Sequence, residues 1–417
     1  MDLLRKALRE VEARVKPFTA ASTSRSDPID LAGTRLIVAG RTFRVGAMFA
    51  EGGAARVYRC SSVSGDGRDE TVDAAAGPNP PPLALKQCLL PPELSDAEAR
   101  REGVVHASVS AHDDVVTLHA HDVLVDGANG DEDEGAARGE KACPPPGTRR
   151  AALLVMDLCE ESLAERVRRL GGLGEKDALR ACACAARAVA HMHARDPPAV
   201  HSDVKPENVL FRDGTWRLCD FGSAVIGDRV FLTPRDRSRA ESSFAKTTTP
   251  TYRAPEMWDV HRPLFARVGV GRPADVWALG CLLFETLENR PPFGHEPKLA
   301  ALQGRFVWST ETVAKTREET RALVRALLAV DPSSRPSADQ TAARCELLLA
   351  ADAETRGAPA ADASGARFET LPTANPEGEL RSREGHAEPN AGWASFDDAD
   401  AEAPTGTVPT TGWATFE

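Results

Sequence analysis

The sequence lacks the features that would place the protein in a membrane, outside the cell or on nucleic acid. No apolar run approaches the ~20 residues that a membrane-spanning helix needs. The nine cysteines include no Cys-x-x-Cys pair, and no secretory segment is recognisable, which favours reduced thiols in the cytosol. The net charge is −11, so no basic excess is left to attract nucleic acid. We therefore expect a cytoplasmic protein without a transmembrane segment and without a nucleic-acid partner.

What the sequence does contain is distributed unevenly along its 417 residues. Residues 351–417 are rich in Ala, Gly, Pro and Thr, and they hold 13 acidic residues against 4 arginines and no lysine. Such a segment cannot bury a core, so we predict a disordered acidic tail there. The preceding part of the chain is long enough to bury a core of about 300 residues.

Three short motifs follow one another in the second half of the sequence. Residues 201–208 read His-Ser-Asp-Val-Lys-Pro-Glu-Asn, residues 220–222 read Asp-Phe-Gly, and residues 254–256 read Ala-Pro-Glu. Each is weak alone, but in this order and at these spacings they resemble the signature set of the protein kinases. The resemblance implies an α+β fold of two lobes: a small antiparallel sheet with a helix, and a larger, mainly helical lobe. It also implies transfer of the γ-phosphoryl group of ATP.

The residue types in these motifs suit that chemistry. The transition state spreads negative charge over the phosphoryl oxygens, so catalysis consists mostly of positioning and charge neutralisation. Asp203 is placed to accept the proton of a substrate hydroxyl, and Lys205 is placed to neutralise the phosphoryl group in transfer. Asn208 and Asp220 supply the oxygen ligands that Mg²⁺ prefers. A single Asp would more simply be a solvated loop carboxylate, but the complete set argues against that interpretation.

A lysine for the phosphates of ATP is expected in the first half of the sequence. Residues 83–86 (Leu-Ala-Leu-Lys) form a short apolar run that ends in Lys86, typical of the third strand of a kinase. Glu102 follows in a segment rich in helix formers, and we predict a Lys86–Glu102 ion pair that orients the lysine. The alternative is that Glu102 is an exposed helix carboxylate, and Gly103 beside it is a poor helix residue.

The loop that should cover the phosphates is atypical. Residues 50–56 read Ala-Glu-Gly-Gly-Ala-Ala-Arg, so of the three glycines usual in this loop only the middle one, Gly52, is present, with Gly53 beside it. We expect backbone amides of these glycines to lie over the phosphates. The alternative is an ordinary Gly-Gly turn.

Several segments resemble the Numb-associated kinases, the group that contains the adaptor-associated kinase and the cyclin-G-associated kinase. The resemblance covers residues 31–350. It implies a cytoplasmic Ser/Thr kinase that acts in clathrin-mediated traffic, at coated vesicles or coated pits, typically on a threonine of an adaptor medium subunit. The matching segments are residues 50–53, 154–159, 220–224, 251–257, 274–283 and 292–294.

The resemblance also implies an adenine pocket that binds ATP together with Mg²⁺. By the resemblance, Val57 and Ala84 line this pocket, and Met156 guards its back. Asp157 and Cys159 would present backbone groups to the adenine ring.

Outside the nucleotide site, three further positions follow from the resemblance. Thr249 occupies the position that contacts the catalytic Asp in Ser/Thr kinases, and Arg335 is placed to form a structural bridge with Glu256. One position departs from the family, because Ser202 stands where the family has an Arg that pairs with a phosphate on the activation segment. Ser202 cannot neutralise a phosphate of about −1.5 to −2 charge, so activation by phosphorylation is not expected.

The remaining segments flank or interrupt the predicted kinase domain at 31–350. Residues 1–30 carry apolar side chains at helical spacing with Arg and Lys between them, which predicts an amphipathic helical extension. It docks on the kinase or is frayed in solvent, or else it contacts a partner or a membrane surface, as a peripheral association. Two polar insertions, residues 61–82 and 127–150, should be disordered loops at hairpin tips.

The predicted tail contains a repeated aromatic motif. Residues 392–396 read Gly-Trp-Ala-Ser-Phe and residues 412–416 read Gly-Trp-Ala-Thr-Phe, each followed by an acidic residue. They resemble the Trp-x-x-Phe-acidic motifs that bind the appendage domains of clathrin adaptors, with the aromatic side chains as anchors. The alternative is that they dock back onto the kinase. The anchor pairs are Trp393/Phe396 and Trp413/Phe416.

These observations predict an active Ser/Thr kinase that its tail recruits to clathrin adaptors. Two alternatives stay open. One is an inactive kinase-fold scaffold, against which the presence of Lys86, Asp203, Asn208 and Asp220 argues. The other is a kinase of another pathway with an unrelated tail partner.

Overall fold

The computed structural model describes both predicted lobes of the chain. The described residues are 29–52, 55–63, 82–91, 94–125, 149–263, 265, 269–294 and 296–357. Predictions for the amphipathic helix, for Gly53, for the interior of both insertions and for the two aromatic motifs of the tail lie outside these residues.

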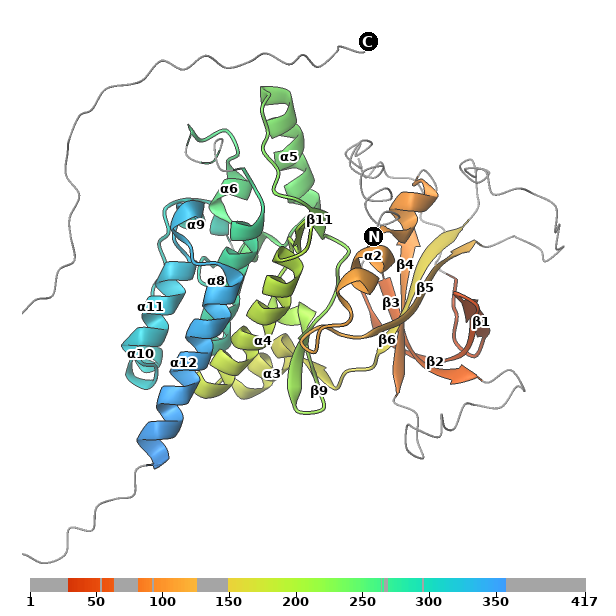
Figure 1. The fold of residues 1–417 in the computed structure, drawn as a ribbon, viewed down its shortest axis with the longest axis horizontal. Coiled ribbons are helices and arrows are strands. Elements are labelled where there is room, and N and C mark those ends of the chain that lie inside the picture. Colours follow the sequence, from red (N-terminus) through yellow and green to blue (C-terminus); the bar gives the residue numbers. More distant parts are fainter. Residues whose placement is uncertain are drawn as a thin grey trace, which may run out of the picture. The chain divides into compact units, whose positions relative to one another are not determined.

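The small lobe is built on a six-stranded antiparallel sheet with one helix, α2 (Asp96–Val109), packed against it (Figure 1). Phe43, Tyr58 and Leu85 are completely buried on the sheet and form the centre of its core. The strands, in their order across the sheet, are β1 (Arg35–Val38), β2 (Arg41–Glu51), β3 (Ala55–Val63), β4 (Leu83–Leu90), β6 (Arg150–Asp157) and β5 (Leu118–Val125).

Strand β1 is an element that the sequence analysis did not expect. Ala39 and Gly40 connect it to β2, and both have positive φ (49° and 78°), as a two-residue hairpin turn between twisted strands requires. Val38 at its end is completely buried, which ties the strand to the core. Lys86 therefore lies on the fourth strand in chain order, β4, and not on the third as we expected.

Helix α2 runs through Gly103 in spite of that residue's poor helix propensity. The helix begins at a capping box, in which the Ser95 hydroxyl accepts from the Glu98 amide and the Glu98 carboxylate accepts from the Ser95 amide. A Cβ atom at position 103 would lie 2.4 Å from the ring of His121 on β5. Close packing against the sheet therefore requires glycine here, and it brings the helix near Lys86.

The large lobe is mainly helical and surrounds helix α8 (Arg272–Glu288), which is buried over almost its whole length. Helix α4 (Glu175–His193) packs between α8 and α12 (Figure 1). The other helices are α3 (Leu163–Leu170), α5 (Pro234–Thr247), α6 (Pro255–Trp258), α9 (Pro297–Leu302), α10 (Thr310–Lys315), α11 (Glu318–Leu327) and α12 (Ala338–Gly357). Short strands hold the loops between them: β7 (Glu161–Ser162), β8 (Ala199–Val200), β9 (Val209–Arg212), β10 (Thr215–Leu218) and β11 (Val225–Ile226). The predicted α+β fold, with a small antiparallel sheet lobe and a larger helical lobe, is confirmed.

Three predicted segment boundaries differ in the structure. The first insertion was expected from residue 61, but Ser61 and Ser62 pair with β2, and Val63 is buried at the end of β3. The second was expected to reach residue 150, but Arg150 begins β6, where its buried guanidinium bonds to Asp96 at the start of α2. The kinase domain was expected to end at residue 350, but α12 continues to Gly357.

Candidate active site

One buried carboxylate, that of Asp275, binds the backbone of the loop at residues 201–208, which carries the first motif. Asp275 on α8 is only 1% exposed and accepts hydrogen bonds from the backbone amides of His201 and Ser202, both at 2.8 Å. Its Oδ2 also lies 2.9 Å from Nε2 of His193. Because two successive amides bind one carboxylate, the backbone that leads into Asp203 is fixed to the most buried helix of the lobe.

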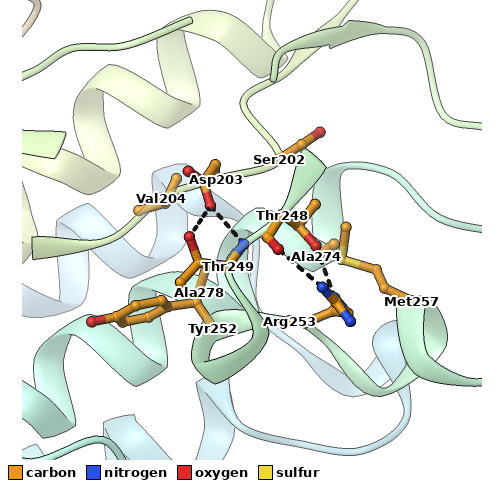
Figure 2. Close-up of a pocket in the computed structure, with 10 residues that line it drawn as sticks. All are labelled: Ser202, Asp203, Val204, Thr248, Thr249, Tyr252, Arg253, Met257, Ala274 and Ala278. Carbon is orange, nitrogen blue, oxygen red and sulfur yellow. Dashed lines mark hydrogen bonds between the residues drawn. The ribbon is translucent and has the colours of Figure 1, made fainter. Parts of the chain in front are cut away.

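Asp203 lies among hydrogen-bond donors in a pocket between this loop and residues 248–257 (Figure 2). Its Oδ1 accepts from the amide (3.0 Å) and the hydroxyl (2.8 Å) of Thr249. Its Oδ2 accepts from Nζ of Lys205 at 2.6 Å, and the same ammonium donates to the Thr249 hydroxyl. The structure thus brings together Asp203, Lys205 and Thr249, which the sequence placed at one site.

The two predicted metal ligands flank this loop. The side-chain amide of Asn208 donates to the carbonyl oxygen of Asp203 (2.9 Å), which directs its nitrogen into the loop and leaves its amide oxygen as the possible ligand. Asp220 has a φ of 65°, and the amide of Gly222 approaches its Oδ1 at 3.4 Å. A carboxylate and an amide oxygen fit Mg²⁺, which takes few protein ligands and completes its shell with water and phosphate oxygens.

Lys86 pairs with one carboxylate from each lobe. Its Nζ lies 2.7 Å from Oε1 of Glu102 on α2 and 2.8 Å from Oδ1 of Asp220. Burial disfavours the charged ammonium, but Glu102 and Asp220 outweigh burial and raise the pKa of Lys86 above its usual value. Burial likewise opposes ionisation of Asp220, yet the charge of Lys86 lowers the pKa of that carboxyl. The site therefore holds one fixed positive charge where phosphate oxygens would bind.

Three aromatic rings in contact join helix α2 to the loop at residues 201–208. The ring of Phe221 lies 4.7 Å from that of His106 on α2 and 5.3 Å from that of His201, centroid to centroid. Burial lowers the pKa of His106 to about 4, so the imidazole is neutral near pH 7, with its Nε2 2.6 Å from the carbonyl of Val116. These contacts keep α2, and with it Glu102, in register with the large lobe.

The predicted adenine residues meet in one apolar cluster between the lobes. Ala84 and Met156 are buried in it, and Val57 and Cys159 pack against it. Sequence reasoning missed Leu210 on β9, which closes the cluster from the large lobe. The sequence offers a signal for this residue, because Leu210 is apolar and stands two positions after Asn208, where the motif at residues 201–208 ends.

Asp157 keeps one of its two backbone groups for a nucleotide, and its side chain has a separate structural role. Its backbone amide donates to the carbonyl of Thr117 (3.1 Å), so a nucleotide could use only the carbonyl at this position. The buried carboxylate binds Arg212 (2.7 Å) and Arg217 (3.2 Å), both from the large lobe. The side chain of Asp157 therefore ties the segment between the lobes to β9 and β10.

Gly52 differs from expectation. Its amide donates to the carbonyl of Ala55 at 2.8 Å and closes the β2–β3 hairpin. Glu51 and Arg56 form an exposed ion pair across the same hairpin. The amide that we expected over the phosphates is therefore occupied by the turn, because the strands pair almost to their ends.

Glu256 and Arg335 form the predicted structural bridge, which is a buried salt bridge. Two bonds of 2.7 and 2.8 Å join the two side chains, which are 1% and 0% exposed. Arg335 also donates to the carbonyls of Pro273 and Ala329. The bridge links α6, which follows the pocket of Asp203, to the start of α8 and the segment before α12.

The fold, the motif order and the geometry agree with the comparison to known families. The protein kinase domain family matches residues 72–344. The chain belongs to the protein kinases. Two of the proteins similar to it are named serine/threonine-protein kinases, and the chain carries a Ser/Thr protein kinase domain.

Three relatives are 32–36% identical to the chain over part of its length. The serine/threonine-protein kinase ppk30 of Schizosaccharomyces pombe is 36% identical over 170 residues, which are 40% of this chain and 17% of the relative. Actin-regulating kinase 1 of Saccharomyces cerevisiae is 35% identical over 161 residues, 38% of this chain and 24% of the relative. A probable serine/threonine-protein kinase of Dictyostelium discoideum is 32% identical over 191 residues, 44% and 23% respectively. The matched segments thus span about a quarter or less of each relative.

Among the described helices, none combines the length and the apolar character that crossing a membrane demands.

Proposed function

We propose that the protein is an active kinase that transfers the γ-phosphoryl group of ATP to Ser or Thr hydroxyls of other proteins. The observation that supports this most strongly is the position of Lys86, whose ammonium lies within 2.8 Å of both Glu102 and Asp220. An inactive scaffold would have no need of this charge arrangement. ATP with Mg²⁺ supplies the phosphoryl group and the positive charge beside it.

Each residue of the site has a role in this proposal. Lys86, oriented by Glu102, would bind phosphate oxygens, and Asn208 and Asp220 would hold Mg²⁺. The substrate hydroxyl donates to Asp203, which takes up its proton as the new O–P bond forms, while the bond between the γ-phosphorus and the β–γ bridging oxygen breaks and ADP leaves. Lys205 lies 2.6 Å from Asp203 and offsets negative charge on the transferred group.

Activity should not depend on phosphorylation of the kinase itself. Thr249 already donates two hydrogen bonds to Asp203 in the unmodified chain, and Ser202 offers no cation to a phosphate. We expect phosphatase treatment to leave kcat/KM within about threefold, which is less than ~1 kcal/mol of activation free energy. Peptide phosphorylation rates before and after treatment, with phosphate removal verified by intact mass, provide the check. Activity that is lost on treatment and returns when the activation segment is rephosphorylated would refute this expectation.

We further propose that the kinase belongs to the Numb-associated group and acts on a clathrin adaptor subunit. The support is the set of matching segments, above all Glu51-Gly52 before the β3 strand and the Asp-Phe-Gly-Ser-Ala run at 220–224. A second candidate is a kinase of the actin cytoskeleton, which the similarity to actin-regulating kinase 1 favours. The division into a helical extension (1–30), a kinase domain and a motif-bearing tail (351–417) is part of the same proposal.

A binding experiment on the tail distinguishes between these two pathways. Each motif should bind an adaptor appendage weakly, at roughly micromolar Kd or above, because a short segment must be ordered on binding. The two Trp residues are twenty positions apart in the sequence. We expect a linker of that length to reach about 25 Å, so that both copies together bind a clustered partner more tightly. We expect the joint substitution Trp393→Ala and Trp413→Ala to abolish binding of the purified tail in calorimetric titrations.

The matched control for this experiment is Phe368→Ala, which removes a tail aromatic outside the motifs and should leave the affinity unchanged. Binding that survives loss of both Trp residues would end the proposal for the motifs. No binding by the unaltered tail would favour the cytoskeletal candidate or docking onto the kinase domain.

A further inference from the structure

Arg253 is a buried cation without a carboxylate partner among the described residues. It is only 5% exposed, and no ion pair joins it to an acidic side chain in that part of the chain. Burial lowers the pKa of its guanidinium, although Asp203 nearby opposes the change. Burying a charge is costly unless good hydrogen bonds compensate for it. The bonds that Arg253 makes therefore indicate what the residue contributes.

Two of these bonds go to a single residue, Thr248. The Nε–H of Arg253 donates to the Thr248 hydroxyl (2.8 Å), and Nη2 donates to the Thr248 carbonyl (2.9 Å). The guanidinium also lies over the ring of Trp258, 4.1 Å from its centroid. The Thr248 hydroxyl in turn donates to the carbonyl of Phe244 at the end of α5. A planar, two-pronged donor stacked on an aromatic ring fixes Thr248 in one orientation.

The peptide unit between Thr248 and Thr249 transmits this restraint to the catalytic carboxylate. Its carbonyl oxygen accepts from Arg253, and its N–H donates to Oδ1 of Asp203 (Figure 2). The peptide unit is planar, so its carbonyl and its N–H rotate together. A rotation that releases Arg253 would therefore also remove the amide from Asp203. In addition, hydrogen bonds in such a chain polarise one another.

We propose that Arg253 is a positioning residue for catalysis, which orients Asp203 through the Thr248–Thr249 peptide unit. The inference rests on the proposed role of Asp203 as the base. Ser202 supplies no cation to this segment, whereas Arg253 supplies a buried one that binds the backbone. The segment after α5 is thereby held against Asp203 by the fold itself.

The test is the substitution Arg253→Lys, which keeps the charge but loses the planar pair of donors. We expect kcat to fall about 10- to 100-fold, because small misplacements of reacting groups have effects of this size. The KM for ATP and the Kd of a fluorescent nucleotide should stay within about twofold, since Lys86 and Asp220 bind the nucleotide elsewhere in the site. Arg262→Lys is the control: Arg262 also bonds to a carbonyl and lies near an aromatic ring, but it does not contact Thr248.

A double-mutant cycle separates positioning from general damage. If Arg253 acts through Asp203, Arg253→Lys should change the residual rate of the Asp203→Asn variant less than about twofold. A merely structural role would cost the same factor in both backgrounds. Should Arg253→Lys fail to fold in thermal unfolding scans, Thr248→Val takes its place. It removes the hydroxyl, keeps the carbonyl, and should lower kcat by about two- to fivefold only when Asp203 is present.

Wild-type kcat in Arg253→Lys, or equal losses in the two backgrounds, would overturn the inference. These outcomes differ from failure of the proposed function. In that case the unaltered chain would not phosphorylate protein, or Asp203→Asn would keep full activity.

Discussion

The substitution Asp203→Asn should lower kcat by about 10²–10⁴-fold, the range typical of losing a general base. Asparagine keeps the size of the side chain but cannot take up the proton of the substrate hydroxyl. The KM for ATP should change little, because the ion pairs of Lys86 with Glu102 and Asp220, which we propose as the charged part of the nucleotide site, do not involve Asp203. Steady-state peptide phosphorylation and nucleotide titration measure both quantities.

The control for this substitution is Asp213→Asn. Asp213 lies at an exposed turn of the same lobe with a φ of 50°, a conformation that asparagine tolerates well. Its turnover should equal that of the unaltered protein. Near wild-type turnover in Asp203→Asn would mean that Asp203 is not the base.

The largest effect on stability should come from Glu256→Gln. This substitution leaves the guanidinium of Arg335 buried without its carboxylate, and removing one partner of such a pair costs about 3–5 kcal/mol. For a domain of this size, with about 2 °C per kcal/mol, we expect Tm to fall by about 6–10 °C. Thermal unfolding without nucleotide, followed by circular dichroism, gives the value directly.

Glu311→Gln is the matched control for that loss. Glu311 pairs with Lys315 one helical turn away, but both side chains are exposed, and water replaces the interaction readily. Its Tm should be unchanged. If the Tm of Glu256→Gln equals the Tm of this control, the buried bridge does not contribute to stability as we argue.

The parts of the site that could be anticipated are those in which one residue type at a fixed spacing is required by the chemistry. The short distances between Lys86 and Glu102, and between Thr249 and Asp203, were expected from the motifs and from the resemblance to protein kinases. The pairing of Glu256 with Arg335 was expected in the same way. What these residues do in catalysis remains a prediction.

The parts that could not be anticipated depend on neighbours that are distant in the sequence. From the sequence, Gly103 is only a poor helix residue. The structure explains it, because a Cβ atom at this position would collide with the ring of His121. The amide of Gly52 was expected to face phosphates, but strand pairing at the hairpin tip engages it. No sequence motif marks Arg253. Its proposed role depends on the Thr248–Thr249 peptide unit, whose carbonyl accepts from Arg253 and whose N–H donates to Asp203.

A phosphorylation assay shows whether this chain is an active Ser/Thr kinase. Purified protein with residues 1–417 is incubated with Mg²⁺, γ-labelled ATP and an adaptor medium subunit. We expect label on Ser or Thr of the substrate with the unaltered protein, and almost none with Asp203→Asn. Absence of label from every protein in the assay, including the kinase itself, or equal labelling by the Asp203→Asn variant, would contradict the proposed kinase activity.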